Sequence, residues 1–113
     1  MSQLSVFRGD DVTYNLSFKD GDDVAIDITD WTIFFTVKKN KLTPDADADI
    51  SKDITVHTSA VDGLSSIVLT DTDTNIDPRV YWYDIQVKKD DGTISTVVKD
   101  KFVVKGDITR RIV

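Results

Sequence analysis

The sequence predicts an all-β fold, an antiparallel β-sandwich of about seven to eight short strands. Val, Ile and Thr, which favour strands, supply 38 of the 113 residues, whereas Ala and Leu together supply nine. All 20 acidic residues are Asp, which favours turns and caps, and the helix former Glu is absent. Several short segments alternate apolar and polar residues between turn-forming clusters, at hairpin spacing. We expect one domain, residues 1–113, around one core.

The first half of the chain predicts three strands. Alternation from Asp11 to Phe18 predicts a strand with one buried face. The Asp- and Gly-containing segment 19–23 predicts a hairpin turn, and alternation at 24–28 predicts the return strand. A third strand follows over 31–37, and we expect Trp31 to anchor the core.

The middle of the chain predicts a long connection, two strands and a helical turn. Residues 38–49 carry charge and a proline without a sustained period, which indicates the longest loop. Strands are predicted over 50–57 and 63–70. The Thr- and Asp-rich segment 70–78 offers N-cap residues and predicts one short helical turn before Pro78.

The last third of the chain predicts the central strand and a hairpin. Residues 79–88 show the most regular alternation, which indicates a strand in the middle of a sheet. An Asp-Gly turn at 91–92 leads to a return strand over 94–105. Asp100 interrupts the apolar parity of that strand, so we expect a bulge near 99–101. Residues 108–113 predict a last edge strand.

Composition excludes or disfavours several function classes. The absence of cysteine excludes a disulfide framework, a thiolate nucleophile and a Cys-based metal site. A net charge of −6 disfavours nucleic acid as a partner. No apolar run approaches the roughly 20 residues of a membrane helix, so we expect no membrane insertion. The start of the chain lacks the pattern of a secretory signal peptide, so we expect synthesis in the cytoplasm.

The sequence predicts no catalytic machinery and no cofactor. It has a single histidine, His57, in polar company at a strand end, and such a residue is usually ordinary structure. It has no glycine-rich phosphate loop and no clustered acid–base pair. We therefore expect that the protein is not an enzyme.

Two groups of side chains are candidates for calcium binding, with ordinary solvated loop charge as the alternative for both. The first matches the D-x-D-x-N opening of a calcium loop, but Ile76 and Trp82 stand where that loop needs Gly and Glu. The second has alternate carboxylates in the long loop. The groups are Asp71, Asp73 and Asn75, and Asp45, Asp47 and Asp49.

Phe34 and Trp82 are the candidate interface residues. Each is a large aromatic residue on the face opposite the main apolar stripe of its strand. Exposed aromatic residues can form a sugar platform or a protein interface, and a covering loop is the alternative explanation.

Several segments in a recurring order carry a family resemblance. They are Phe7-Arg8-Gly9-Asp10-Asp11, Ile26 to Ile33, Tyr81 to Val87, Asp91-Gly92-Thr93 and Gly106 to Arg110. Over almost its whole length the chain resembles the immunoglobulin-like domains of phage and prophage tail and baseplate proteins, including the N-terminal domain of baseplate upper proteins. These motifs are strand and turn patterns, and they carry no catalytic residues.

The resemblance implies an immunoglobulin-like antiparallel β-sandwich in a virion. Its partners would be other phage tail or baseplate proteins, with a homo-oligomer among the assemblies that this allows. The implied function is structural, through protein–protein contacts in virion assembly or host attachment. The residues leave open a carbohydrate-binding or adhesive β-sandwich module, with or without calcium, as the alternative.

Overall fold

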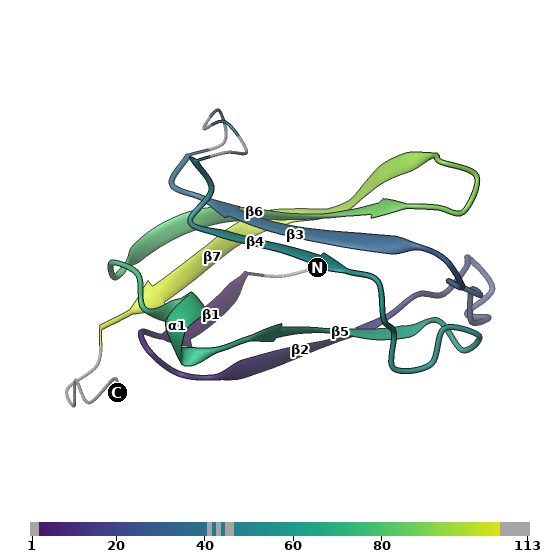
Figure 1. The fold of residues 1–113 in the computed structure, drawn as a ribbon, viewed down its shortest axis with the longest axis horizontal. Helices are drawn as coiled ribbons and strands as arrows, with labels where there is room; N and C mark the ends of the chain where they lie inside the picture. Colours follow the sequence, from purple (N-terminus) through teal and green to yellow (C-terminus); the bar gives the residue numbers. More distant parts are fainter. Residues whose placement is uncertain (1–2, 41, 43, 45–46, 107–113) are drawn as a thin grey trace.

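The structure, a computed structural model, describes residues 3–40, 42, 44 and 47–106. Seven strands form two sheets that pack face to face, with one helical turn between the fifth and sixth strands (Figure 1). In this part of the chain no helix is long and apolar enough to cross a membrane. The elements are β1 Leu4–Phe7, β2 Val12–Ser17, β3 Thr32–Lys38, β4 Ile50–Ile54, β5 Leu64–Leu69, α1 Asp71–Thr74, β6 Arg79–Lys88 and β7 Ile94–Lys105.

The two sheets differ in width. The large sheet has the order β1-β7-β6-β3-β4, and the small sheet contains β2 and β5. This arrangement of β7, β6, β3 and β4 opposite β2 and β5 is that of an immunoglobulin-like sandwich, which confirms the predicted fold class. One pairing differs from the expected antiparallel pattern, because β1 runs parallel to β7. The chain leaves β1 for the opposite sheet, so β1 lies beside the last strand instead of its neighbour in sequence.

The predicted central strand, β6, lies in the middle of the large sheet. Tyr81, Tyr83, Ile85 and Val87 are buried, and the residues between them are at least partly exposed. Neighbouring strands complete an aromatic cluster in the core. The ring centroids of Phe35 and Tyr83 lie 5.7 Å apart. Such contacts stabilise a core by about 0.5–1.5 kcal/mol per pair beyond the burial of area.

Tyr81 forms a corner at the entry to β6. Its side chain is fully buried, and its hydroxyl donates a 2.6 Å hydrogen bond to the carbonyl oxygen of Asp77. Burial, with the negative charges of Asp49 and Asp77, raises the pKa of Tyr81 to about 12. A tyrosine at this corner, bonded to the backbone a few residues upstream, recurs in immunoglobulin-like sandwiches.

The predicted helical turn is present as α1. Thr70 is its N-cap and forms a capping box with Asp73, so that each side chain bonds to the backbone of the other. Thr74 is fully buried, and its hydroxyl donates a 2.8 Å hydrogen bond to the carbonyl oxygen of Asp10. This bond holds α1 against the turn between β1 and β2.

The predicted return strand over 24–28 is wrong. The carboxylate of Asp20 accepts hydrogen bonds from the N–H groups of Asp22 and Val24, and Asp27 accepts one from the N–H of Thr29. These local bonds compete with ladder bonds, and only an isolated bridge between Lys19 and Ala25 forms. The segment is therefore a loop across the end of the small sheet.

The bulge in β7 lies two residues before the predicted range. Ile85 pairs with Val98 and Gln86 with Thr96, which leaves Val97 as the extra residue. Residues 99–101 keep a regular register against β6. Asp100 occupies a position whose side chain faces the inside of the sandwich. A charged residue fits there because the side chain stays partly exposed and accepts a hydrogen bond from the N–H of Lys101. The strand predicted over 108–113 lies outside the described residues.

Candidate functional site

Phe34 and Trp82 both lie on the outer face of the large sheet, the side turned away from β2 and β5. Both are partly exposed, on the adjacent strands β3 and β6. Trp82 pairs with Lys38, and Phe34 pairs with Gln86. Four residues separate them along the strands, or about 13 Å, which is too far for their rings to stack. The predicted parity of each residue is confirmed, but the two belong to separate surfaces.

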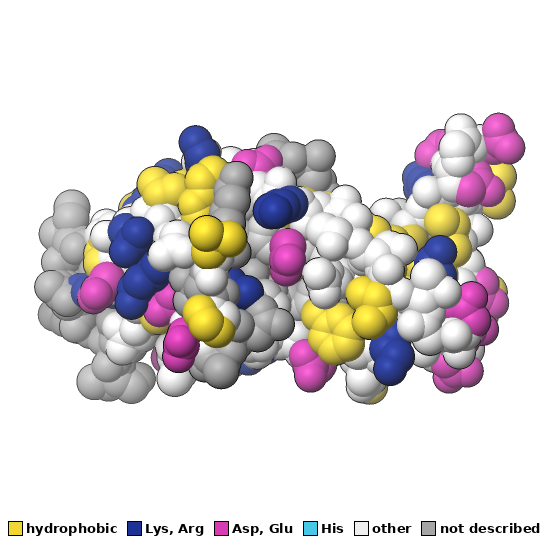
Figure 2. Space-filling view, turned by 90° about the horizontal axis from the view of Figure 1, so that it is seen from above, with side chains coloured by type: hydrophobic (Ala, Val, Ile, Leu, Met, Phe, Trp, Pro, Cys, Tyr) yellow, Lys and Arg dark blue, Asp and Glu magenta, His cyan; other side chains and the backbone are white. Residues whose placement is uncertain are grey.

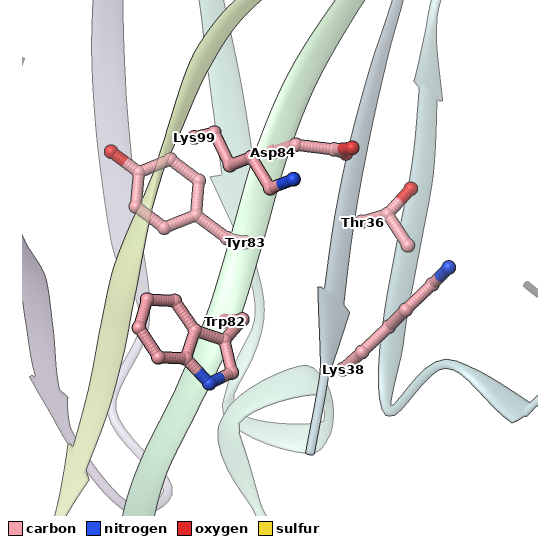
Figure 3. A pocket seen from close by; sticks show the side chains of 6 residues that line it. All are labelled: Thr36, Lys38, Trp82, Tyr83, Asp84 and Lys99. Atoms are coloured by element: carbon pink, nitrogen blue, oxygen red, sulfur yellow. The ribbon is translucent and has the colours of Figure 1, made fainter. Parts of the chain in front are cut away.

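Trp82 borders a shallow hollow between β3, β6 and β7. The hollow has a volume of about 70 Å³ and is lined by Thr36, Lys38, Trp82, Tyr83, Asp84 and Lys99 (Figure 3). The Nζ of Lys101 lies 5.8 Å from the centroid of the Trp82 ring. This is the range of a cation–π contact, so the indole already has a cationic neighbour.

Further hydrophobic side chains extend from Trp82 toward β1 on the same outer face of the sheet. Phe7 is 51% exposed, and Val80, whose partner in β7 is Val103, is 47% exposed. The Nζ of Lys105 lies 5.6 Å from the ring centroid of Phe7. We call this surface the Trp82 face, and it comprises Phe7, Val80, Trp82 and Val103 with Lys38, Lys99, Lys101 and Lys105.

The Trp82 face alternates apolar and charged groups. Figure 2, which looks onto the large sheet, shows hydrophobic side chains in separate patches among basic and acidic ones. The four lysines give this surface a positive character in a chain whose net charge is −6. Phe7 was missed by the sequence analysis because it joins this surface only through the pairing of β1 with β7, whereas the outward parity of Val80 follows from β6 alone.

The first group of calcium candidates is occupied with capping the helical turn. The Oδ2 of Asp73 accepts a hydrogen bond from the N–H of Thr70 and lies 2.8 Å from the Nζ of Lys52. Partial burial acts to raise the pKa of Asp73, but the bonds from Lys52 and Thr70 outweigh it and lower that pKa. The N–H of Asp71 donates to Asp11, and Asn75 is the C-cap.

The second group of calcium candidates is only partly described, because Asp45 lies outside the described residues. Asp47 is exposed, and its N–H donates to the carbonyl oxygen of Pro44. The carboxylate of Asp49 lies 3.6 Å from the Nζ of Lys39. Across residues 3–40, 42, 44 and 47–106, no three His or Asp side chains gather in a way that could hold a metal ion.

His57 connects three segments of the sandwich. Its Nδ1 lies 2.9 Å from the hydroxyl of Ser65 in β5, and its Nε2 lies 2.8 Å from the carbonyl oxygen of Trp31. A carbonyl oxygen can only accept a hydrogen bond, so Nε2 carries a proton. The imidazole therefore ties the connection between β4 and β5 to the start of β3, which is a structural contact.

Comparisons with known proteins support the fold. No protein-family model and no curated protein sequence matches the chain. Among solved structures, the chain is similar to the soluble domain of PmoD from Methylocystis sp. ATCC 49242 (Rockwell), with a TM-score of 0.52 and 13% sequence identity. The match covers 88% of this chain and 76% of that chain. At this identity the likeness shows a shared β-sandwich architecture alone.

Proposed function

We propose that this domain is a non-enzymatic structural component of a phage or prophage tail or baseplate. It acts through protein–protein contacts in virion assembly or host attachment. The proposal rests on the resemblance of its strand and turn motifs to such domains, and on one structural observation, the Trp82 face. The assignment to a virion comes from the resemblance, and the choice of surface comes from the structure.

The apolar part of the Trp82 face suits the centre of a protein interface, and its lysines, a residue type depleted at interface centres, suit the rim. Aromatic residues are enriched at the centres of interfaces, where they contribute much of the binding free energy. Trp82 lies on β6, the central strand of the large sheet, with the exposed Val80 two residues before it and the exposed Phe7 farther away on β1. Sheet residues are held rigidly, so little side-chain and backbone entropy is lost on binding. The surrounding lysines favour a partner with acidic groups.

Sugar binding is the alternative, because Trp82 lies beside the polar side chains of Thr36 and Asp84. Two observations favour a protein partner. The hollow measures about 70 Å³, whereas pockets for small molecules measure roughly 300–1,000 Å³. In addition, Lys101 already lies over the indole ring on which a sugar would stack.

The proposal is tested by locating the chain in particles. Phage or tail-like particles are purified by density gradient from the organism that encodes the protein, and the chain is detected with a specific antibody. We expect the chain to sediment with the particles. A Trp82→Ala variant should no longer sediment with the particles. Phe34→Ala is the matched control, because Phe34 lies on the outer side of the same sheet but does not belong to the Trp82 face, and this variant should still sediment with the particles.

The opposite result is equally defined. A chain that is absent from all particle fractions, while folded by circular dichroism, contradicts the virion assignment. Specific binding of Trp82-containing protein to an immobilised glycan, lost in Trp82→Ala, would support the sugar-binding alternative instead.

A further inference from the structure

A groove opens at one flank of the sandwich, between the small sheet and the inner face of the large sheet. Its volume is about 530 Å³. β2 and the loop that follows it form one wall, and β6 and β7 form the other. The apolar residues of its lining are Leu16, Phe18, Ile26, Trp31, Ile85, Val87, Val97 and Val98.

The groove follows from the unequal widths of the sheets. Two strands cannot cover the inner face of a sheet of five strands, and apolar surface of β7 stays open: Val97 is 46% exposed and Val98 is only partly buried. Trp31, expected to be a core anchor, instead lies at this opening and is only partly buried. Its ring packs edge-on against Phe18 at a centroid distance of 6.0 Å.

Both walls of the groove end in open strand edges. Within the described residues β2 pairs only with β5, and β1 covers only Phe102–Lys105 of β7. The N–H of Phe18 donates a hydrogen bond to the carbonyl oxygen of Gly63, so it points to the side of β2 on which β5 lies. Alternate residues of a paired strand point their N–H groups in opposite directions, so those of Thr13, Asn15 and Ser17 point to the open side. Asn15 and Ser17 line the groove.

The charges of the groove are positive. Its lining includes Lys19 and Lys89 and no carboxylate, in a chain with a net charge of −6. The Nζ of Lys89 lies 5.5 Å from the centroid of the Trp31 ring, directly at the apolar opening. Lys19 already pairs with Asp23, whose carboxylate lies 3.4 Å from its Nζ, so an occupant with an acidic residue at this end would complement Lys89.

From the apolar lining, the open edge and the charges, we infer that the groove is a strand-insertion site for an extended segment of a partner protein. The segment adds to β2 as the third strand of the small sheet, and its alternate apolar side chains cover Trp31, Val97 and Val98, lining residues that keep exposed apolar surface. An acidic residue of the segment lies near Lys89. This site is separate from the Trp82 face, so it goes beyond the proposed function and stands or falls independently.

The test uses a synthetic peptide, acetyl-Asp-Thr-Val-Thr-Val-Thr-Val-amide, and the Trp82→Phe variant. The chain has two tryptophans, so Trp31 is the sole indole reporter in that variant. We expect a saturable change in Trp31 fluorescence on addition of peptide. Amide hydrogen exchange at Thr13, Asn15 and Ser17 should slow in the complex, because these N–H groups become paired.

Two matched pairs isolate the backbone pairing. Asn15→Pro removes one edge N–H and should weaken binding by about tenfold, which corresponds to one or two lost hydrogen bonds. Asn15→Ala keeps the N–H and should bind like the parent protein. A peptide N-methylated at every residue keeps its side chains but lacks N–H groups on both edges, and it should not bind even if Asn15→Pro proves to be unfolded. Lys89→Gln should weaken binding of the Asp peptide more than of its Asn counterpart.

Three results would overturn the inference. The first is the absence of saturable binding up to the solubility limit of the peptide. The second is equal binding of the N-methylated and unmodified peptides without protection of the edge amides, which indicates non-specific apolar contact. The third is a dimer, detected by light scattering, that Asn15→Pro dissociates and the peptide competes away, because the occupant would then be a second copy of this chain.

Discussion

The hydroxyl of Tyr81 donates a 2.6 Å hydrogen bond to the carbonyl oxygen of Asp77, four residues upstream. Asp77 and Pro78 belong to the connection by which the chain leaves α1 and enters β6 (Figure 1). The bond therefore fixes the crossing from the small sheet to the centre of the large sheet. Because the Tyr81 side chain is fully buried, this one contact couples a surface connection to the core.

Replacement of Tyr81 by Phe should remove this bond while the ring stays packed. We expect Tyr81→Phe to lower the free energy of unfolding by about 1 kcal/mol, as measured by urea denaturation. Tyr14→Phe is the control, since its hydroxyl forms an exposed and longer bond of 3.3 Å to the carbonyl oxygen of Ser5. Equal losses of unfolding free energy in the two variants would show that the hydrogen bond of Tyr81 stabilises the protein no more than an exposed one does.

Alkaline pH should destabilise the protein through the same residue. Burial raises the pKa of Tyr81 from 10.0 to about 12, so the folded state holds its proton more tightly than the unfolded state does. The corresponding stability is fully present below pH 10 and is lost as pH rises through 12. Two pKa units correspond to about 2–3 kcal/mol.

The measurement for this effect is urea unfolding at several pH values between the two pKa values. Burial also raises the pKa values of Tyr14 and Tyr83, so part of the decline should remain in every variant. Tyr81→Phe should show a clearly shallower decline than the parent protein. Parallel curves would contradict the assignment of the alkaline transition to Tyr81.

Much of the fold could be predicted from local pattern. The alternation of β6 predicted a central strand, and the cluster of N-cap residues before Pro78 predicted a helical turn. The return strand over 24–28 was wrong although its apolar period is regular. There the side chains of Asp20 and Asp27 bond to nearby backbone N–H groups, a competition that hydrophobic period does not report.

The candidate sites depend on distant pairing and were less predictable. The outward parity of Trp82 follows from its strand alone, but Phe7 joins the same surface only because β1 pairs with β7. The apolar groove exists because the small sheet has fewer strands than the large sheet that it packs against. Trp31 lies at that opening because no third strand covers it, and sheet membership is not encoded in the local sequence around Trp31.

His57 should contribute to stability through its two ring nitrogens. His57→Ala removes the contacts to the Trp31 carbonyl and to Ser65, whose side chain is buried. We expect a loss of about 1–3 kcal/mol in the free energy of unfolding, because Ser65 is left without this partner. A double-mutant cycle with Ser65→Ala should give a coupling energy of about 0.5–3 kcal/mol. Strictly additive losses would show that the imidazole and the hydroxyl act independently.

Asp73 provides the last prediction, since its carboxylate serves both the capping box and the contact with Lys52. Asp73→Ala should lower the free energy of unfolding by about 0.5–2 kcal/mol at neutral pH. Despite the opposing effect of burial, bonds from Lys52 and Thr70 lower the pKa of Asp73 below its ordinary 3.8. Its contribution is therefore present above that pH and is lost as the carboxyl protonates in acid.

Thermal unfolding at neutral and acidic pH, with and without calcium, separates the capping role from metal binding. If Asp73 caps the turn, the gap between Asp73→Ala and the parent protein should be the same with and without calcium, and it should close in acid. Asp71→Ala is the matched control from the same turn, and it leaves the contact between Asp73 and Lys52 in place. If Asp71 and Asp73 instead hold calcium with Asn75, both variants should differ from the parent protein only when calcium is present, because removal of either ligand then abolishes stabilisation by the ion.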